Sequence, residues 1–185
     1  MQLVQEISYK AWIYDHSEPK VRYTLGKKGT RPFVCFGVNP STATPKRLDP
    51  TVASVARFAK DHGYDGWLML NLYPQRATNP DKMHKKFQPI LHRENLHWIR
   101  HYLHKFSQES QVHVWCAWGT LIEKRPYLLQ CLSDIHDGIN SFNLEYYTRG
   151  SRSKNGHPHH PLYLRKDAPL NPFDFRNYLK NAFSR

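Results

Sequence analysis

Short apolar runs recur along the middle of the chain, and each leads into polar or turn-forming residues. Such runs lie at residues 32–38 (PFVCFGV), 66–72 (GWLMLNL) and 112–118 (VHVWCAW). Apolar runs of this length are too short for core helices and are typical of fully buried strands. A fourth strand is expected at residues 143–148.

Segments with helical spacing of apolar residues lie between these strands. Asp49 suits a helix cap, and the apolar spacing continues from there to Gly63. Further helices are expected over residues 89–106 and, after Gly119, through Leu132. Alternating strands and helices are joined by right-handed crossovers, which produce a parallel sheet. The pattern therefore predicts an α/β fold, a three-layer α/β/α sandwich with a mostly parallel central sheet.

The two ends of the chain carry weaker signals. Residues 21–25 (VRYTL) are expected to add an edge strand, and residues 171–183 a closing helix with Pro172 in its first turn. No repeat or flexible linker divides the 185 residues. We therefore expect a single domain over residues 1–185.

Composition narrows the class of protein. Hydrophobic residues make up 39% of the chain and charged residues 23%, which excludes disordered and fibrous proteins. No apolar stretch approaches the roughly 18–20 residues of a membrane span, and no signal-like segment is present, so we expect a cytoplasmic protein without a membrane partner. An odd number of widely spaced cysteines favours buried thiols: Cys35, Cys116 and Cys131.

The charge balance indicates an anionic partner. There are 27 Lys and Arg against 15 Asp and Glu, a net charge of +12 with histidine neutral. This excess is typical of nucleic-acid-binding proteins, so DNA is the expected partner; the alternative is a basic protein without one. We expect a monomer without metal or other cofactor. His97, His101 and His104 share one helix face, but without a nearby carboxylate this spacing favours a hydrated surface over a metal site.

Polar residues follow each of the four predicted strands. In α/β folds of this kind, ligands bind beyond the carboxyl ends of the strands. The rule selects residues 39–42 after the first strand and Asn71 with Arg76 after the second. It also selects residues 118–120 and residues 156–164. We expect the functional site where these segments meet.

Four motifs at these places resemble the uracil-DNA glycosylase superfamily. GVNPSTA at residues 37–43 resembles the first motif, which reads GINPG in the mismatch-specific branch. LMLNLYPQRAT (68–78) is similar to the LLLN segment of the uracil-specific branch, and VWCAWGTLIEK (114–124) to its LLWGxxAxxK junction. HHPLYL (159–164) resembles the second active-site motif, HPSPLS. The ordered set NPST, DPT, NL, WG and HPLY also resembles an uncharacterised bacterial and phage family of unknown function.

The resemblance implies a uracil-DNA glycosylase-like fold and a monofunctional DNA glycosylase. Such an enzyme hydrolyses the N-glycosidic bond of a modified, deaminated or mismatched base that is flipped out of DNA. The resemblance implies that Asn71 reads the base edge, His160 stabilises the departing base and Asn39 positions the attacking water. Asn39 stands where uracil-specific members carry aspartate, and Ser41 stands where the motif has glycine.

Several of these residues have a second interpretation. His157 fits the same motif as His160, so the register of the motif is open. Together with His159, these histidines form either a metal cluster or ordinary loop residues. Asp49 acts either as a catalytic base or only as a helix cap. Asn71 is either a base reader or a polar residue that ends a strand.

Other residues are expected to contact the base or the DNA. Phe58 and Tyr73 either stack on the flipped base or belong to the core. Leu164, four residues after His160, corresponds to the wedge leucine that fills the gap left by the base, or packs in the core. Each candidate for contact with the DNA backbone either binds a phosphate or is only a solvated surface group. These candidates are Ser41, Thr42, Lys46, Arg47, Arg76, Lys124, Arg165 and Lys166.

Two further functions fit the sequence. One is a catalytically inactive DNA-binding module with the same fold, which Ser41 and the missing motif aspartate favour. The other is an enzyme that acts on free nucleosides or nucleotides. The net charge of +12 disfavours this last function, because a small substrate does not need so broad a positive field.

Overall fold

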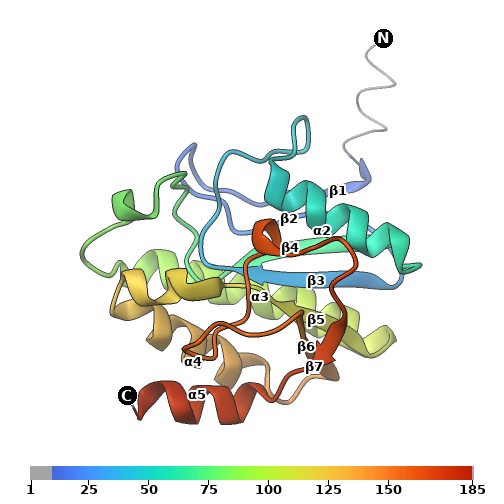
Figure 1. Ribbon diagram of the computed structural model, residues 1–185. Helices are drawn as coiled ribbons and strands as arrows, with labels where there is room; N and C mark the ends of the chain where they lie inside the picture. The colour runs from blue at the N-terminus through green and yellow to red at the C-terminus, as the bar shows by residue number, and fades with distance from the viewer. Residues whose placement is uncertain (1–9, 185) are drawn as a thin grey trace.

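The computed structural model describes residues 10–184, and a seven-stranded sheet forms its centre (Figure 1). The strands lie in the order β1-β2-β4-β3-β5-β6-β7. Their bounds are β1 Trp12–Ile13, β2 Leu25–Lys27, β3 Pro32–Gly37, β4 Gly66–Asn71, β5 Val112–Cys116, β6 Leu144–Arg149 and β7 Leu170–Pro172. The three strands predicted from the apolar runs correspond to β3, β4 and β5, and the fourth predicted strand corresponds to β6.

The four central strands run parallel to one another. β3 pairs with β4 on one side, from Pro32 opposite Gly66 to Gly37 opposite Asn71, and with β5 on the other. β6 continues the parallel part beside β5, whereas β1, β2 and β7 add antiparallel strands at the two edges. The expected α/β fold with a mostly parallel sheet is confirmed. The pairing of β3 with β4 brings Gly37 and Asn71 together at the carboxyl edge.

Helices cover both faces of the sheet (Figure 1). The α-helices are α2 Pro50–Asp61, α3 Pro89–Glu109, α4 Tyr127–Ile139 and α5 Phe175–Phe183, and the 3-10 helices are η1 Pro80–Lys82, η2 Gly119–Lys124 and η3 Pro161–Tyr163. Successive strand residues point to opposite faces, so Cys35 packs with α2 whereas Phe36 packs with α3, α4 and α5. Burial on both faces explains why the strands are continuous apolar runs.

The expected edge strand at residues 21–25 is wrong. β2 begins only at Leu25, and Val21 makes an isolated bridge to Gln75. The backbone N–H groups between them bond to loops instead of a strand: that of Arg22 donates to Pro74 O, and that of Tyr23 to Asp15 O. The apolar pattern of this segment therefore reflects burial, not strand pairing.

Two helix predictions also need correction. The closing helix α5 begins at Phe175, where the side chain of Asp174 caps it, and Pro172 lies in β7 instead of the first helical turn. The segment after Gly119 is not one helix but η2 followed by α4. Pro126 separates the two, because proline has no N–H to continue a helical hydrogen-bond series.

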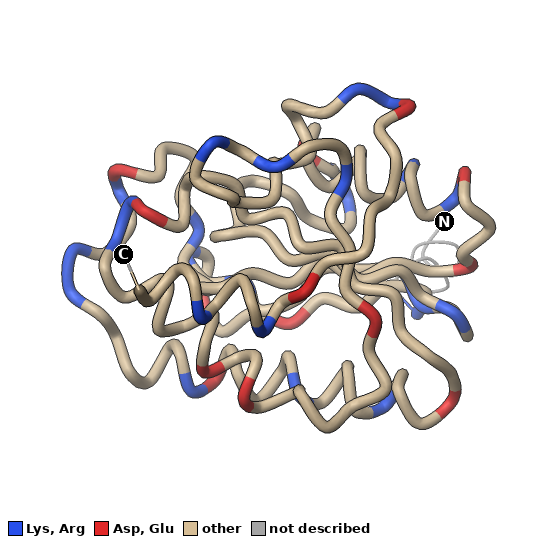
Figure 2. The backbone as a smooth tube through the Cα atoms, turned by 60° about the horizontal axis from the view of Figure 1, so that its bottom comes forward, with Lys and Arg blue, Asp and Glu red and all other residues tan. Residues whose placement is uncertain are grey.

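The three cysteines are free and buried, as expected. Burial raises the pKa of the Cys131 thiol to about 12 and thereby keeps it protonated. Within residues 10–184, no helix combines the length and apolar character needed to cross a bilayer. Lys and Arg are spread over several sides of the backbone and do not form one stripe (Figure 2).

Candidate functional site

A cavity of about 490 Å³ opens at the carboxyl ends of β3 and β4. Its volume falls in the range of roughly 300–1,000 Å³ that is usual for small-molecule sites. Its lining comes from segments far apart in the sequence. Seven of the site residues predicted from the sequence line it: Asn39, Ser41, Thr42, Asp49, Asn71, Lys124 and His160. Its buried lining residues include Val38, Pro40 and Val52 as well as four that we call the cavity floor: Arg22, Gly37, Met69 and Asn71.

Asn71 ends β4 on the cavity floor. Its side chain is fully buried, and neither Oδ1 nor Nδ2 has a hydrogen-bond partner among residues 10–184. Buried amides are nearly always paired, and an unpaired one costs about 1–3 kcal/mol. Such an amide is typical of a position where a ligand or an ordered water completes the pairing.

Two neighbours, Gly37 and Asn95, determine the surroundings of Asn71. Gly37 on β3 leaves space beside it, since a Cβ there would lie 3.2 Å from Asn71 Oδ1 and 2.7 Å from Met69 Cε. From α3, Asn95 donates its Nδ2 to Asn71 O at 2.9 Å and to Leu72 O at 3.3 Å. Asn95 was not among the residues predicted from the sequence, although a polar residue within the apolar stripe of α3 was a usable signal.

Asn39 follows β3 and presents an acceptor. Its Nδ2 donates to Ala77 O at 2.8 Å and to Pro40 O at 3.0 Å. Carbonyl oxygens only accept hydrogen bonds, so these contacts fix which end of the amide is the NH₂ group. No side chain or backbone N–H of the described chain donates to Oδ1, which leaves this oxygen as the acceptor available to a water or ligand.

His160 presents a donor. Its Nδ1 accepts the backbone N–H of Leu162 at 3.4 Å and so caps η3. Burial lowers the pKa of His160, and Asp49 opposes this effect only in part. The imidazole is therefore neutral at physiological pH and carries its proton on Nε2.

Gly119 connects His160 to the sheet. Its backbone lies in the left-handed region, with φ of +63°, and its N–H donates to Pro158 O at 2.8 Å. A Cβ at this position would lie 3.4 Å from His160 Cβ. Glycine at the end of β5 thus allows the loop of His160 to approach the sheet closely.

Asp49 lines the cavity, and each of its carboxylate oxygens accepts one backbone N–H. Oδ1 accepts the N–H of Val52 at 2.9 Å and caps α2, and Oδ2 accepts the N–H of Ala43 at 3.3 Å. This arrangement matches the capping interpretation. Among the described residues, the other carboxylate in the lining is that of Asp81, which pairs with Lys124 at 3.0 Å.

The cavity floor also contains a buried arginine that the sequence analysis missed. Arg22 is 1% exposed, and its Nη1 donates to Ala43 O at 3.1 Å. Burial lowers its pKa to about 10, with a further contribution from Arg76, so it remains protonated at neutral pH. No local sequence pattern distinguishes this arginine from a surface one.

The two histidines that fit the motif, His157 and His160, have different surroundings. Its Nδ1 lies 2.7 Å from Tyr178 Oη and its Nε2 lies 2.8 Å from Glu123 Oε1. Trp118 Nε1 also donates to Tyr178 Oη, at 3.1 Å. His157 therefore ties its loop to α5 and η2, whereas His160 lines the cavity.

Three predicted base or DNA contacts pack inside the protein instead. Phe58 and Tyr73 are buried core residues, and Leu164 is partly buried against the core under α2. The exposed apolar side chains at the cavity rim are Leu162, 51% exposed, and Tyr163, 81% exposed. Leu164, which was predicted as the wedge because it follows His160 by four residues, is therefore a packed side chain and not an exposed one.

The predicted phosphate contacts divide into two groups. Arg76 is used internally: its Nη1 donates to Ser41 O at 2.6 Å and its Nη2 to Tyr14 Oη at 2.8 Å. Ser41 Oγ lies 3.1 Å from Thr78 Oγ1 at the cavity mouth. The remaining candidates are exposed: Thr42, Lys46, Arg47, Lys124, Arg165 and Lys166. Of these, Arg165 and Lys166 line a separate groove beside α2.

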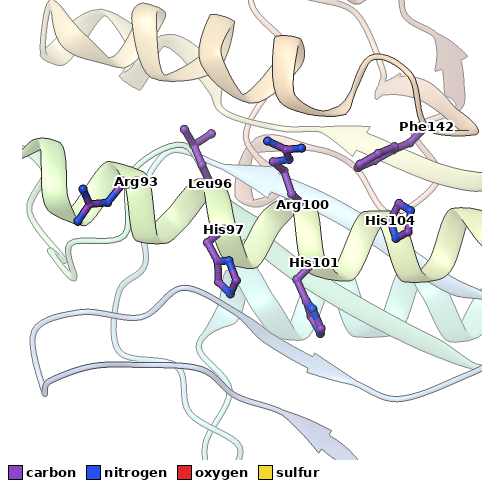
Figure 3. Close-up of a pocket in the computed structure, with 7 residues that line it drawn as sticks. All are labelled: Arg93, Leu96, His97, Arg100, His101, His104 and Phe142. Carbon is purple, nitrogen blue, oxygen red and sulfur yellow. The ribbon is translucent and has the colours of Figure 1, made fainter.

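A larger hollow of about 610 Å³ lies over the outer face of α3 (Figure 3). His97 and His101 point to one side of the helix, whereas Leu96 and Arg100 point to the other (Figure 3). None of its lining residues has a buried polar atom without a partner. In the described part of the chain, no group of three or more His, Cys, Asp or Glu side chains is placed to hold a metal ion. We therefore place the functional site at the cavity beside β3 and β4.

Comparison with curated proteins and with solved structures gives no match to this chain. A family model described as "Protein of unknown function (DUF1643)" matches residues 22–162. The matched range begins at Arg22 and includes Asn39, Asn71 and His160. Because this range covers more than half of the chain, the protein belongs to the DUF1643 family.

Proposed function

We propose that the protein is a DNA glycosylase that hydrolyses the N-glycosidic bond of a modified, deaminated or mismatched base flipped out of DNA. The observation that carries this proposal is the meeting of Asn39, Asn71 and His160 around one cavity, with the buried amide of Asn71 unpaired. The resemblance of the four motifs to the uracil-DNA glycosylase superfamily supports it, as does the net charge of +12.

The three residues suit the steps of this reaction. The bond from C1′ to the base nitrogen breaks through an oxocarbenium-like sugar while negative charge develops on the base. The Nε2–H of His160 donates to a base oxygen, and this hydrogen bond strengthens as the charge grows. Asn71 has a donor and an acceptor for the base edge, and Asn39 Oδ1 accepts a hydrogen bond from the attacking water.

The rim of the cavity suits a DNA duplex. Leu162 and Tyr163 are exposed apolar side chains beside the cavity mouth, where they can enter the stack and fill the space that the flipped base leaves. Lys124 on the rim and Arg165 in the neighbouring groove are placed for phosphate contacts. In this proposal Leu162 and Tyr163 take the wedge role expected for Leu164.

The test is a strand-break assay on defined duplexes. The protein is incubated with duplexes that contain uracil, hypoxanthine, thymine mismatches or modified cytosines, and alkali then cleaves any abasic sites. We expect breaks at one of these bases, and His160→Ala should lower the rate by roughly 10²–10³-fold, as loss of an oxyanion donor does. His104→Ala, on the outer face of α3, is the matched control and should leave the rate unchanged.

A catalytically inactive DNA-binding module is the second candidate. One observation favours it: both carboxylates in the cavity lining already serve other contacts, Asp49 as the cap of α2 and Asp81 as the partner of Lys124. This candidate predicts salt-dependent binding to duplex DNA without abasic product for any base in the panel. Strand breaks that His160→Ala abolishes would exclude it.

A further inference from the structure

The cavity floor holds a positive charge that no carboxylate of the described chain neutralises directly. Arg22 is 1% exposed, and it forms no ion pair with any Asp or Glu in residues 10–184. Within these residues, its one side-chain hydrogen bond goes from Nη1 to Ala43 O, and its buried Nε has no partner. A buried guanidinium left in this state is destabilising unless another group supplies acceptors or negative charge.

The groups around Arg22 add to the excess of positive charge. Arg76 donates to the same carbonyl, Ala43 O, at 3.2 Å, so two guanidinium groups converge on one acceptor. Asp49 is the compensating carboxylate nearby, but it forms no ion pair with either guanidinium, and its two oxygens accept the N–H groups of Val52 and Ala43. Two cations and one anion leave this end of the cavity electropositive.

A second buried arginine shows that burial alone does not leave a guanidinium unsatisfied. Arg149 is 4% exposed and donates to Lys166 O at 3.0 Å and to Ala168 O at 3.3 Å. Its guanidinium also lies 4.3 Å from the ring centre of Phe58. Arg149 lies outside the cavity and serves the packing of the sheet against α2. Arg22 differs because it lines the cavity and keeps an unused donor.

We propose that Arg22 forms an anion-binding subsite on the cavity floor that takes the ionised form of an oxo-nucleobase. The choice of a nucleobase rests on the proposed function. Asn71 distinguishes an ionised base from a carboxylate. Its Oδ1 requires a hydrogen-bond donor on the ligand, and a carboxylate offers only acceptors. A base ionised at its glycosidic nitrogen still has an N–H beside a carbonyl for Asn71, and another carbonyl oxygen for Arg22. An amino base such as cytosine would instead turn an NH₂ group toward these donors.

The subsite gives Arg22 a role in bond cleavage. The electron pair of the C1′–N bond stays with the base, whose carbonyl oxygens share the charge. Water adds through its oxygen to C1′, and its proton ends on the released base. The Arg22 guanidinium, which stays protonated at neutral pH, donates to the oxygen that gains charge. Arg22 and His160 would then share the stabilisation of the departing base.

Equilibrium binding of free bases tests the subsite without requiring catalysis. Calorimetry at pH 8 compares 5-nitrouracil, which is ionised at that pH, with uracil, which is neutral, and with cytosine and inorganic phosphate. We expect wild-type protein to bind 5-nitrouracil about tenfold more tightly than uracil, since a hydrogen bond to a charged group typically exceeds a neutral one by about that factor. Arg22→Met should remove this preference. Arg149→Met, the matched buried arginine, should retain it.

The outcomes separate this inference from the glycosylase proposal. Selective 5-nitrouracil binding with a blank strand-break panel would retain the subsite and remove the glycosylase. Strand breaks at the wild-type rate in Arg22→Met would do the reverse. Equal affinity for phosphate and 5-nitrouracil, or no binding of any probe by the wild type, would also overturn the subsite. Arg22→Lys provides a folded comparison if Arg22→Met does not fold, and it should keep part of the preference because it keeps the charge.

Discussion

In the proposed function, His160 combines two roles that depend on a single protonation state. Its Nδ1 must be free of a proton to accept the N–H of Leu162, and its Nε2 must carry one to donate into the cavity. Burial lowers the pKa of the imidazole and keeps this neutral tautomer at physiological pH. Protonation would place a second proton on Nδ1 and break the contact that shapes η3.

The titration of His160 is the first prediction. By NMR we expect a pKa below its ordinary value of 6.5, with the Nε2–H tautomer above that pKa. The neutral form is favoured in the folded state, so its contribution to stability is complete above pH 6.5 and is lost as the pH falls through the lower, folded pKa. A pKa at or above 6.5, or an Nδ1–H tautomer, would contradict this description.

Two buried asparagines are expected to respond in opposite ways to replacement. Asn71→Leu removes two unpaired polar groups, so the free energy of unfolding should rise by up to about 1 kcal/mol while ligand binding is lost. Asn95→Leu, the matched control, removes hydrogen bonds to Asn71 O and Leu72 O and should cost about 1–3 kcal/mol. Denaturant unfolding measures both. A lower free energy of unfolding for Asn71→Leu would mean that another group of the protein forms hydrogen bonds with the Asn71 amide.

At the scale of elements, the start of α2 separates two interpretations of one carboxylate. Asp49→Ser keeps a helix cap but removes the charge, whereas Asp49→Ala removes both. We expect Asp49→Ala to lower the free energy of unfolding by about 0.5–2 kcal/mol and Asp49→Ser to stay near the wild type. Strand-break activity should survive in the serine variant. Its loss there, with normal stability, would identify Asp49 as the catalytic base.

The short helix η3 carries the contacts of the rim. Leu162 is 51% exposed, so Leu162→Ala should leave the melting temperature unchanged but reduce activity on duplex DNA more than on single strands, which need no wedge. Leu164→Ala, two residues away, should instead lower the melting temperature because Leu164 packs against the core. Equal effects of Leu162→Ala on both substrates would remove the wedge role.

At the scale of the whole molecule, the spread of positive charge predicts how DNA binds. Lys and Arg lie on several sides of the backbone (Figure 2), so in the proposed function the net charge of +12 would attract DNA generally and the cavity rim would supply orientation. Affinity should fall linearly with salt on a double logarithmic plot, and Lys124→Ala should reduce the slope by about 1. Salt-independent binding in a fluorescence titration would contradict a backbone contact. Arg76→Ala is unsuited to this test, because Arg76 holds loops together.

The sequence by itself determined the layers and the location of the site. Apolar runs of strand length between amphipathic helices require burial on both faces, and parallel strands place their polar end residues at one edge, so Asn39 and Asn71 were predictable as neighbours. Asp49 as a cap was predictable as well, because capping depends on a few adjacent residues.

Only the tertiary structure decided what each polar side chain does at that edge. His157 and His160 have the same local sequence signal, but long-range contacts with Tyr178 and Glu123 hold one of them and leave the other at the cavity. Arg22 and Arg76 are likewise two arginines whose burial and partners come from distant loops. Burial and hydrogen-bond partners depend on the packing of distant segments, and a local pattern does not contain that information.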